Sequence, residues 1–342
     1  MATCDVGDDV WELDNTVKEL EAFAACIFGK ESALFVPSSC MANLIAVMAH
    51  CSGRGEEILV GDRSHISLYE QGNVSTIGGV HVRTLKNFDD GTFCLKELGL
   101  KKRPANNVHF PKTSLVCIET SHNMCGGSAV KKSFIDEVRR EIGDGVRIHV
   151  DGARIFNSIT ALGITPSEYT ESVDSIAVCL SKGLAAPVGA VLIGSSSFMR
   201  KAKMLRKALG GGMRQAGVIA CCGQIALRDM VGRLYEDHDN ARLLYLKISS
   251  IPGIIISEPA TNIVKFSLDE SVFKDVDLSG LTSELQKRNV WMITVDEGRA
   301  VRAVTHLHVS SDDVARAGSI LQEVLSEVIS GTLSIAPSER LY

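Results

Sequence analysis

The chain has 342 residues, a net charge of −5 and a hydrophobic fraction of 45%. This length suffices for one large domain and a smaller one with a well-buried core. The mild charge argues against nucleic acid as the main partner, and no apolar run approaches the ~18 residues that a membrane span needs.

The ten cysteines lie mostly in apolar or alanine-rich runs, and none has the paired spacing of a zinc site. Buried free thiols in a reducing compartment explain them better than a disulfide framework. The acidic start of the chain lacks the apolar region of a signal peptide. The sequence therefore predicts a cytoplasmic protein without a metal site.

The first half of the chain alternates between helical and strand patterns. Apolar periodicity predicts a helix over 16–28, and hydroxyl side chains in 38–43 are expected to cap a helix over 44–51. The other elements expected here are strands at 32–36, 57–60, 80–85, 114–119, 146–150, 175–180 and 190–193 and helices at 64–72 and 133–142. Apolar strands that alternate with helices predict an α/β sandwich whose sheet is covered on both faces.

The second half changes character after the triple glycine at 210–212. A long helix is expected over 215–247, followed by strands at 254–257, 263–267 and 300–304 and helices at 278–287 and 312–329. This pattern predicts a smaller α+β domain. The expected organisation is an N-terminal segment (1–30), a large domain (31–235), a small C-terminal domain (236–330) and a polar, frayed tail (331–342).

Two of the predicted strands end in residues that suit pyridoxal 5′-phosphate (PLP) chemistry. Asp151 follows the strand at 146–150, and Lys182 follows the strand at 175–180. Ligands of open α/β sheets bind at the carboxyl ends of the strands. A lysine there can form a Schiff base with the cofactor's aldehyde, and a carboxylate keeps the ring nitrogen protonated. Each residue alone is also ordinary turn chemistry, so the pair carries the prediction.

Several motifs together resemble the low-specificity L-threonine aldolases over residues 6–325. They are HVDGARIFN at 149–157, SKGLAAPVG at 181–189, LGGGMRQAG at 209–217, THL at 305–307, GDDV at 7–10 and YEDHDN at 235–240. The resemblance implies a fold-type I PLP-dependent transferase fold. It has a large α/β/α sandwich domain, a mostly parallel sheet and a smaller α+β domain. It also implies cleavage of L-threonine, L-allo-threonine and related β-hydroxy-α-amino acids to glycine and an aldehyde. The expected assembly is a homotetramer, a dimer of dimers.

The resemblance assigns the central roles position by position. Lys182 matches the Schiff-base lysine, and Asp151 matches the partner of the ring nitrogen. Arg154 and Arg302 match arginines that hold the substrate carboxylate, for which a planar guanidinium is well suited.

Four histidines need separate treatment. His65 matches the residue that stacks on the cofactor ring. His122 matches a histidine near the substrate hydroxyl, where a neutral imidazole can take a proton. His306 and His308 alternate along a predicted strand, but without a third ligand in register they are interpreted as structural.

The phosphate site is expected at the start of a helix, where backbone N–H groups and the helix dipole favour an anion. Ser39, Cys40 and Met41 correspond to this cradle, with Ser39 and Cys40 in place of the family's usual glycine and threonine. Arg214 resembles a residue that reaches the phosphate region. Trp11 replaces a tyrosine usual near the substrate.

Two alternatives remain open at this point. Another fold-type I enzyme, an aminotransferase or a β-eliminating lyase, would use the same aspartate and lysine. A catalytically impaired relative is the second alternative. It is suggested by Cys40 and by a sequence that starts just before Gly7, without the hydroxyl-rich segment that precedes this point in the family.

Overall fold

The computed structural model describes residues 1–51, 54–274 and 276–335. The chain forms two compact units, and each is described by itself. The first comprises Met1–Cys125 and Ala129–Leu234, and the second comprises Gly126–Ser128 and Tyr235–Tyr342. Within the described part of the chain, no helix combines the length and apolarity that crossing a membrane requires.

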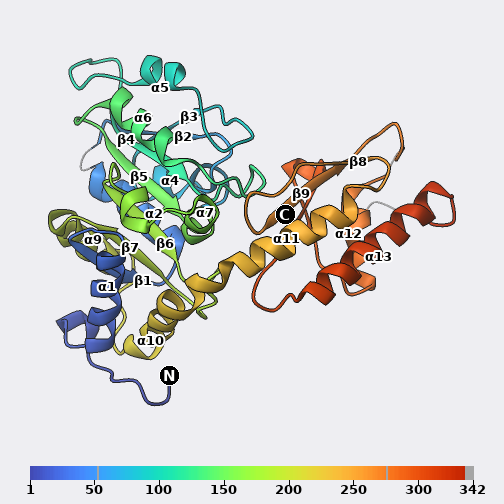
Figure 1. Ribbon diagram of the computed structural model, residues 1–342. Helices are drawn as coiled ribbons and strands as arrows, with labels where there is room; N and C mark the ends of the chain where they lie inside the picture. The colour runs from blue at the N-terminus through green and yellow to red at the C-terminus, as the bar shows by residue number, and fades with distance from the viewer. Residues whose placement is uncertain (52–53, 275, 336–342) are drawn as a thin grey trace. The chain divides into compact units, whose positions relative to one another are not determined.

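A seven-stranded sheet organises the first unit (Figure 1). Its strands in spatial order are β1 (Ser32–Val36), β7 (Ala190–Gly194), β6 (Ser175–Cys179), β5 (Arg147–Gly152), β4 (Lys112–Glu119), β2 (Glu56–Gly61) and β3 (His81–Leu85). Strand β7 is antiparallel to both its neighbours, and the other pairs are parallel. The expected mostly parallel sheet is confirmed.

Helices cover both faces of this sheet. They are α1 (Asn15–Ile27), α2 (Ser39–His50), α3 (His65–Leu68), α4 (Asn73–Thr76), α5 (Leu95–Lys101), α6 (Lys132–Ile142), α7 (Ile155–Leu162), α8 (Pro166–Tyr169), α9 (Ser196–Ala208) and α10 (Gly217–Ile225). Because strand side chains alternate between faces, Phe35 packs with α1 and α10 whereas Leu34 and Val36 pack with α2 and α9.

Several helices differ from the expectation, and α4, α5, α7 and α8 were not predicted. Helix α2 begins at Ser39, earlier than expected, because the Ser38 hydroxyl accepts a hydrogen bond from the Met41 N–H and caps the helix. Helix α9 was not predicted. The long helix expected over 215–247 is interrupted by a π turn (Ala226–Met230) and a 3₁₀ turn (Val231–Arg233) before α11 (Leu234–Ile248). Residue periodicity does not reveal such changes in helical winding.

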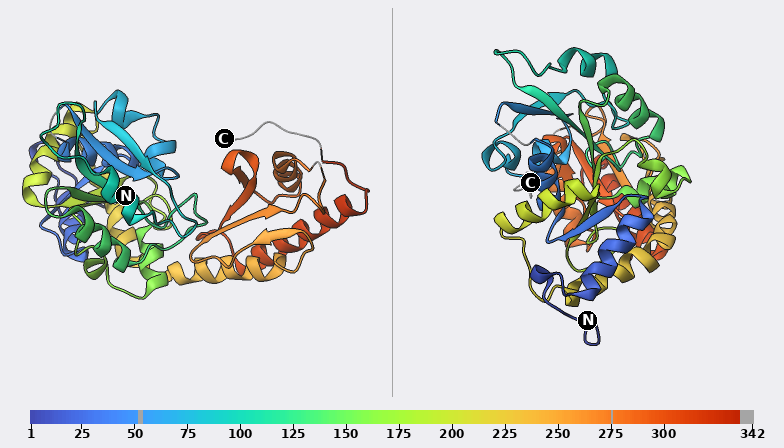
Figure 2. Two further views of the ribbon diagram at one scale, coloured as in Figure 1. Left: turned by 90° about the horizontal axis from the view of Figure 1, so that it is seen from above. Right: turned by 90° about the vertical axis from the view of Figure 1, so that its left-hand side faces the viewer.

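The second unit contains a four-stranded antiparallel sheet. Its order is β10 (Ile293–Val295), β11 (Ala300–Val304), β9 (Ile263–Leu268) and β8 (Ile254–Ile256). Residues of β8, β9 and β11 share one apolar core with α11, α12 (Leu278–Lys287) and α13 (Ser311–Ile329). Figure 2 shows these helices beside the strands. The predicted α+β character of this part of the chain is confirmed, although the three-residue strand β10 was too short to predict.

Two expectations about the second unit are wrong. His306 and His308 do not lie on a strand, because β11 ends at Val304 and a turn follows. The tail is not polar throughout its described part, because Leu333 and Ile335 pack against the unit's core. Residues 336–342 lie outside the described residues.

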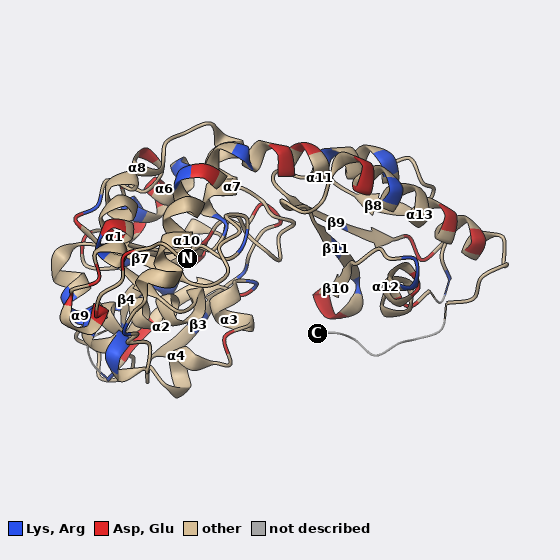
Figure 3. Cartoon of the chain, turned by 90° about the horizontal axis from the view of Figure 1, so that it is seen from below, with Lys and Arg blue, Asp and Glu red and all other residues tan. Residues whose placement is uncertain are grey.

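The charged residues are spread over the molecule (Figure 3), and the cysteines form no disulfide among the described residues. Basic and acidic residues are interspersed along the helices (Figure 3). All ten cysteines lie among the described residues and are free thiols. The predicted burial holds only for Cys51, Cys117, Cys125 and Cys179, whereas Cys26 is exposed and the others are half-buried.

Glu21 on α1 makes the fold sensitive to pH. Its carboxylate accepts a hydrogen bond from the Phe35 N–H at 2.8 Å, and burial raises the pKa of Glu21 to about 7. The folded protein therefore retains a proton that the unfolded chain loses near pH 4.5. We expect this residue's contribution to the unfolding free energy to fall by about 3 kcal/mol as pH rises from 4.5 to above 7.

Glu21→Gln removes this titration while keeping an oxygen acceptor for Phe35. Urea unfolding of both proteins at pH 5 and pH 8 measures the effect. The variant should gain stability relative to the wild type at the higher pH. An unchanged difference between the two proteins would contradict the assignment.

Candidate active site

The carboxyl edge of the parallel strands gathers the polar side chains of the first unit. Asp151 lies near the end of β5 and is only 2% exposed. Its Oδ1 accepts a hydrogen bond from the Ala153 N–H at 3.1 Å, and its Oδ2 accepts one from the Asn43 amide at 3.0 Å. These two hydrogen bonds hold the Asp151 carboxyl group in one orientation at the end of β5.

Lys182 follows β6 at the same edge. The turn after it is closed by a hydrogen bond from the Ala185 N–H to the Lys182 carbonyl at 2.8 Å, with Ala185 at φ 59°. The charge of Lys182 acts on both His65 and Cys40. The lysine therefore belongs to the same cluster as these two residues.

His65 is held between two carboxylates. It begins α3 after β2, and its N–H donates to Glu119 Oε2 at 2.6 Å. Its Nδ1 lies 2.9 Å from Glu70 Oε1, and this hydrogen bond raises the pKa of His65. The bond fixes the orientation of the ring, as a stacking residue requires.

The start of α2 forms a cradle beside His65. The Ser39 hydroxyl oxygen is buried and makes no hydrogen bond within the described part of the chain. The Cys40 thiol lies within 4.8 Å of ligand atoms of both His65 and Glu70. Burial, followed by the charges of Glu70 and Asp151, raises the pKa of Cys40 to about 11. Cys40 therefore stays a neutral thiol, which does not repel an anion.

A glycine loop passes close to this cradle. A Cβ atom on Gly211 would lie 2.3 Å from the Met41 sulfur, so a larger residue would force the Met41 side chain to move. Gly211 thus lets the loop pack against the Met41 side chain at the start of α2.

His122 is the least expected feature of this edge. It lies three residues after β4 and is fully buried, yet neither ring nitrogen makes a hydrogen bond among the described residues. Its Nδ1 is 3.9 Å from Glu119 Oε1. Burial lowers the pKa of His122, so the ring is neutral at neutral pH. Buried polar atoms without partners are rare, which makes His122 a candidate functional residue.

Arg154 is hydrogen-bonded to the residue that follows His122 in the sequence. It precedes α7, and its guanidinium donates to Asn123 Oδ1 at 3.3 Å. Asn123 is in turn tied to Glu119, whose Oε1 accepts the Asn123 N–H at 2.8 Å. The arginine is thereby connected to the loop that carries His122.

Three further predicted site residues complete the set, and one of them belongs to the second unit. Arg214 is paired with Asp8 at 2.5 Å and is largely exposed. Trp11 is 72% exposed on the N-terminal segment. Arg302 belongs to the second unit, where it pairs in register with Ile293 and Lys265. The described contacts do not place these residues with Asp151.

Sequence reasoning missed three residues of the site. Glu119, Glu70 and Asn43 are each at most 5% exposed and bind the predicted residues directly. Glu119 gave the clearest signal, because it is a carboxylate at the end of an apolar strand.

Comparisons with known proteins agree with this geometry. The profile of the family described as beta-eliminating lyase matches residues 1–271. Low-specificity L-threonine aldolase 1 of Arabidopsis thaliana is 40% identical over 328 residues, which cover 95% of this chain and 91% of that protein. This chain belongs to the low-specificity L-threonine aldolase family.

Solved structures show the same fold at lower identity. Leishmania major threonine aldolase aligns with a TM-score of 0.77 at 18% identity, covering 92% of this chain and 90% of that one. A structure described as SPT with PLP aligns with a TM-score of 0.71 at 14% identity, covering 96% and 81%. The expected fold-type I architecture is confirmed.

Proposed function

We propose that this protein is a PLP-dependent lyase that cleaves L-threonine and L-allo-threonine to glycine and acetaldehyde. The observation that carries the proposal is His122, a buried neutral imidazole with no described hydrogen-bond partner, at the same sheet edge as Asp151 and Lys182. Family membership and the names of the relatives support the same reaction.

The residues at this edge fit the cofactor. Asp151 would bind the ring nitrogen, Lys182 would hold the aldehyde group, and His65 would lie on the ring. The buried Ser39 hydroxyl and the first N–H groups of α2 would hold the phosphate. When bound, the cofactor supplies an electron sink for the pair released at Cα.

The protein's part in the reaction is to bind the substrate and move protons. Arg154 binds the substrate carboxylate. His122 accepts the proton of the β-hydroxyl, the oxygen forms the aldehyde C=O, and the Cα–Cβ bond breaks. Its electron pair stays on Cα, which gains a proton to give glycine. The role of Arg302 and the homotetrameric assembly remain predictions from the family resemblance, and light scattering of the purified protein checks the assembly.

The deciding experiment uses purified protein loaded with PLP. L-Threonine and L-allo-threonine are added, and acetaldehyde and glycine are both measured. Equal amounts of the two products support the proposal. A 2-oxo acid with ammonia would indicate β-elimination, and a 2-oxo acid with pyridoxamine phosphate would indicate transamination. Either result would overturn the proposal.

His122→Ala tests the base. We expect kcat for L-threonine to fall about 10²–10⁴-fold, the usual contribution of a positioned acid–base group, while bound PLP keeps its visible absorption band. His308→Ala, at an exposed histidine, is the matched control and should leave kcat unchanged. Full activity of the His122 variant would show that another group takes the proton.

A further inference from the structure

A chain of hydrogen bonds leads from Asp151 through the sheet and away from the site. The Asn43 amide donates to Asp151 Oδ2 at 3.0 Å, and Asn43 Oδ1 lies 3.1 Å from His149 Nε2. His149 Nδ1 lies 2.9 Å from the Ser175 hydroxyl, which lies 2.8 Å from His50 Nε2. Asn43, His149, Ser175 and Asp151 are each at most 2% exposed.

The periodicities of the elements explain this alignment. Asn43 and His50 are seven residues apart on α2, which is two helical turns, so they lie on one face. His149 and Asp151 alternate on β5 and share the face that α2 covers. Ser175 is the β6 partner of His149. Regular secondary structure thus brings all five polar residues onto one line.

The direction of each hydrogen bond follows from the contact at Asp151, where the Asn43 amide nitrogen donates. A carboxylate only accepts hydrogen bonds, so Asn43 turns its NH₂ group toward Asp151 and its oxygen toward His149. The second N–H of this NH₂ group donates to Glu70 Oε1 at 2.8 Å, which agrees with that orientation. His149 must then carry its proton on Nε2.

The outer half of the chain follows in the same way. Burial lowers the pKa of His149 to about 4 and that of His50 to about 3, so both rings are neutral and have one N–H each. His149 Nδ1 therefore accepts from the Ser175 hydroxyl, and Ser175 accepts from His50 Nε2–H. Every donor points toward Asp151.

We propose that Asn43, His149, Ser175 and His50 form an oriented hydrogen-bond relay that fixes the Asp151 carboxyl group in one orientation. The inference rests on the proposed role of Asp151 at the cofactor's ring nitrogen. The four residues are positioning residues, because they act on the cofactor only through Asp151. Reversing the direction of these hydrogen bonds would turn the Asn43 oxygen toward the carboxyl oxygens of Asp151. Two oxygens with negative partial charge repel each other, so this arrangement is disfavoured.

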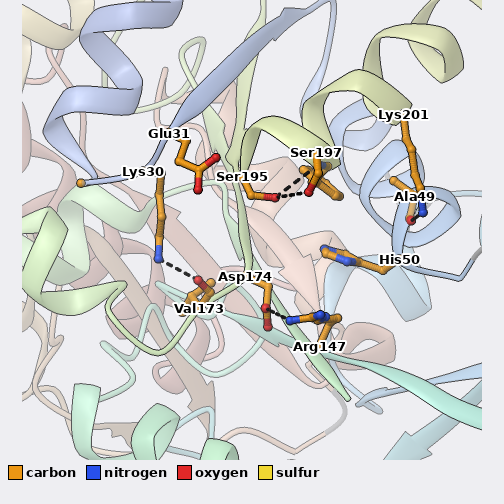
Figure 4. Close-up of a pocket in the computed structure, with 12 residues that line it drawn as sticks. Lys30, Glu31, Ala49, His50, Arg147, Val173, Asp174, Ser195, Ser197 and Lys201 are labelled. Carbon is orange, nitrogen blue, oxygen red and sulfur yellow. Dashed lines mark hydrogen bonds and ion pairs between the residues drawn. The ribbon is translucent and has the colours of Figure 1, made fainter. Parts of the chain in front are cut away.

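The relay ends at a cavity on the opposite edge of the sheet. His50 lines this cavity of about 640 Å³ together with Arg147, Lys201 and Ser197 (Figure 4). The His50 ring stacks on Phe198, with ring centroids 4.5 Å apart and an interplanar angle of 20°. This stacking positions the ring of the outermost donor.

Nitrogen-15 NMR of the histidine side chains in the PLP-loaded protein tests the directions. Signals are assigned by their loss in His50→Gln and His149→Gln. We expect both rings to be neutral Nε2–H tautomers between pH 6 and 8. An Nδ1–H tautomer or a cationic ring at His149 would overturn the relay. This readout does not use threonine cleavage, so it tests the relay even if the proposed reaction is wrong.

Ser175→Ala tests the effect on the cofactor, because it removes the central donor and acceptor. We expect kcat to fall about tenfold with little change in KM, and the pH dependence of the visible PLP band to shift. Ser175→Thr keeps the hydroxyl and should restore both properties. Ser197→Ala, in the same cavity outside the relay, should change neither.

His50→Gln and His50→Leu test the outer end. Glutamine places an amide N–H near the position of Nε2, so His50→Gln should resemble the wild type, whereas His50→Leu should resemble Ser175→Ala. If Ser175→Ala and His50→Leu lower only the melting temperature and leave kcat and the PLP band unchanged, the relay is merely structural and the proposal is wrong.

Discussion

Lys182→Ala should lower kcat for L-threonine by about 10³-fold or more, which corresponds to ~4 kcal/mol in the activation barrier. The physical reason is that no other lysine is expected at this sheet edge from the sequence motifs, and the Lys182 charge acts directly on Cys40 and His65. The exposed Lys96 on α5 provides the control, because Lys96→Ala should keep full activity.

Borohydride reduction makes this prediction independent of turnover. Reduction of the PLP-loaded wild type should attach the cofactor to the peptide that contains Lys182, as detected by mass spectrometry. The Lys182→Ala variant should gain no such mass. Attachment to a different lysine would show that the assignment from the SKGLAAPVG motif is wrong.

Asp151→Asn should lower kcat about 10²–10³-fold, the usual loss when one buried electrostatic partner is removed. The amide has nearly the same shape but carries no charge, so it does not keep the ring nitrogen protonated. In the relay, the asparagine side chain could face the NH₂ group of Asn43 with either its oxygen or its own NH₂ group, so its orientation would no longer be unique. Steady-state kinetics and the visible spectrum measure the effect.

An N-methylated analogue of PLP separates charge from structure in this variant. Its ring nitrogen is permanently cationic and needs no carboxylate to keep it so. We expect the analogue to restore part of the activity of Asp151→Asn and to give the wild type no advantage. If the analogue fails to bind either protein, Asp151→Ala with ordinary PLP should still show the loss, and full activity of that variant would contradict the role of Asp151.

The elements that the sequence predicted well are those with strong local patterns. Strands β1 and β11 and helix α12 have the expected bounds, because each is a short periodic segment between clear breaks. Elements with weaker signals were missed, including the four-residue helices α4 and α8 and the charged helix α9. Their formation depends on caps and on packing against the sheet.

The residues of the candidate site also differ in whether a local sequence pattern could predict them. Asp151 and Lys182 were predictable because a charged residue directly after an apolar strand is a local feature, and the sheet then brings strand ends together. The pairing of Arg214 with Asp8 was not predictable, because these residues are 206 positions apart in the chain. No periodicity connects residues at such a separation.

The sequence by itself determined the family, the α/β alternation and the residues that end β5 and β6. Only the tertiary structure decided that His122 is buried without a described partner and that Asn43, His149, Ser175 and His50 line up behind Asp151. The reason is physical. Propensity and periodicity act within a few residues, whereas the burial and orientation of a polar side chain depend on which distant segments pack around it.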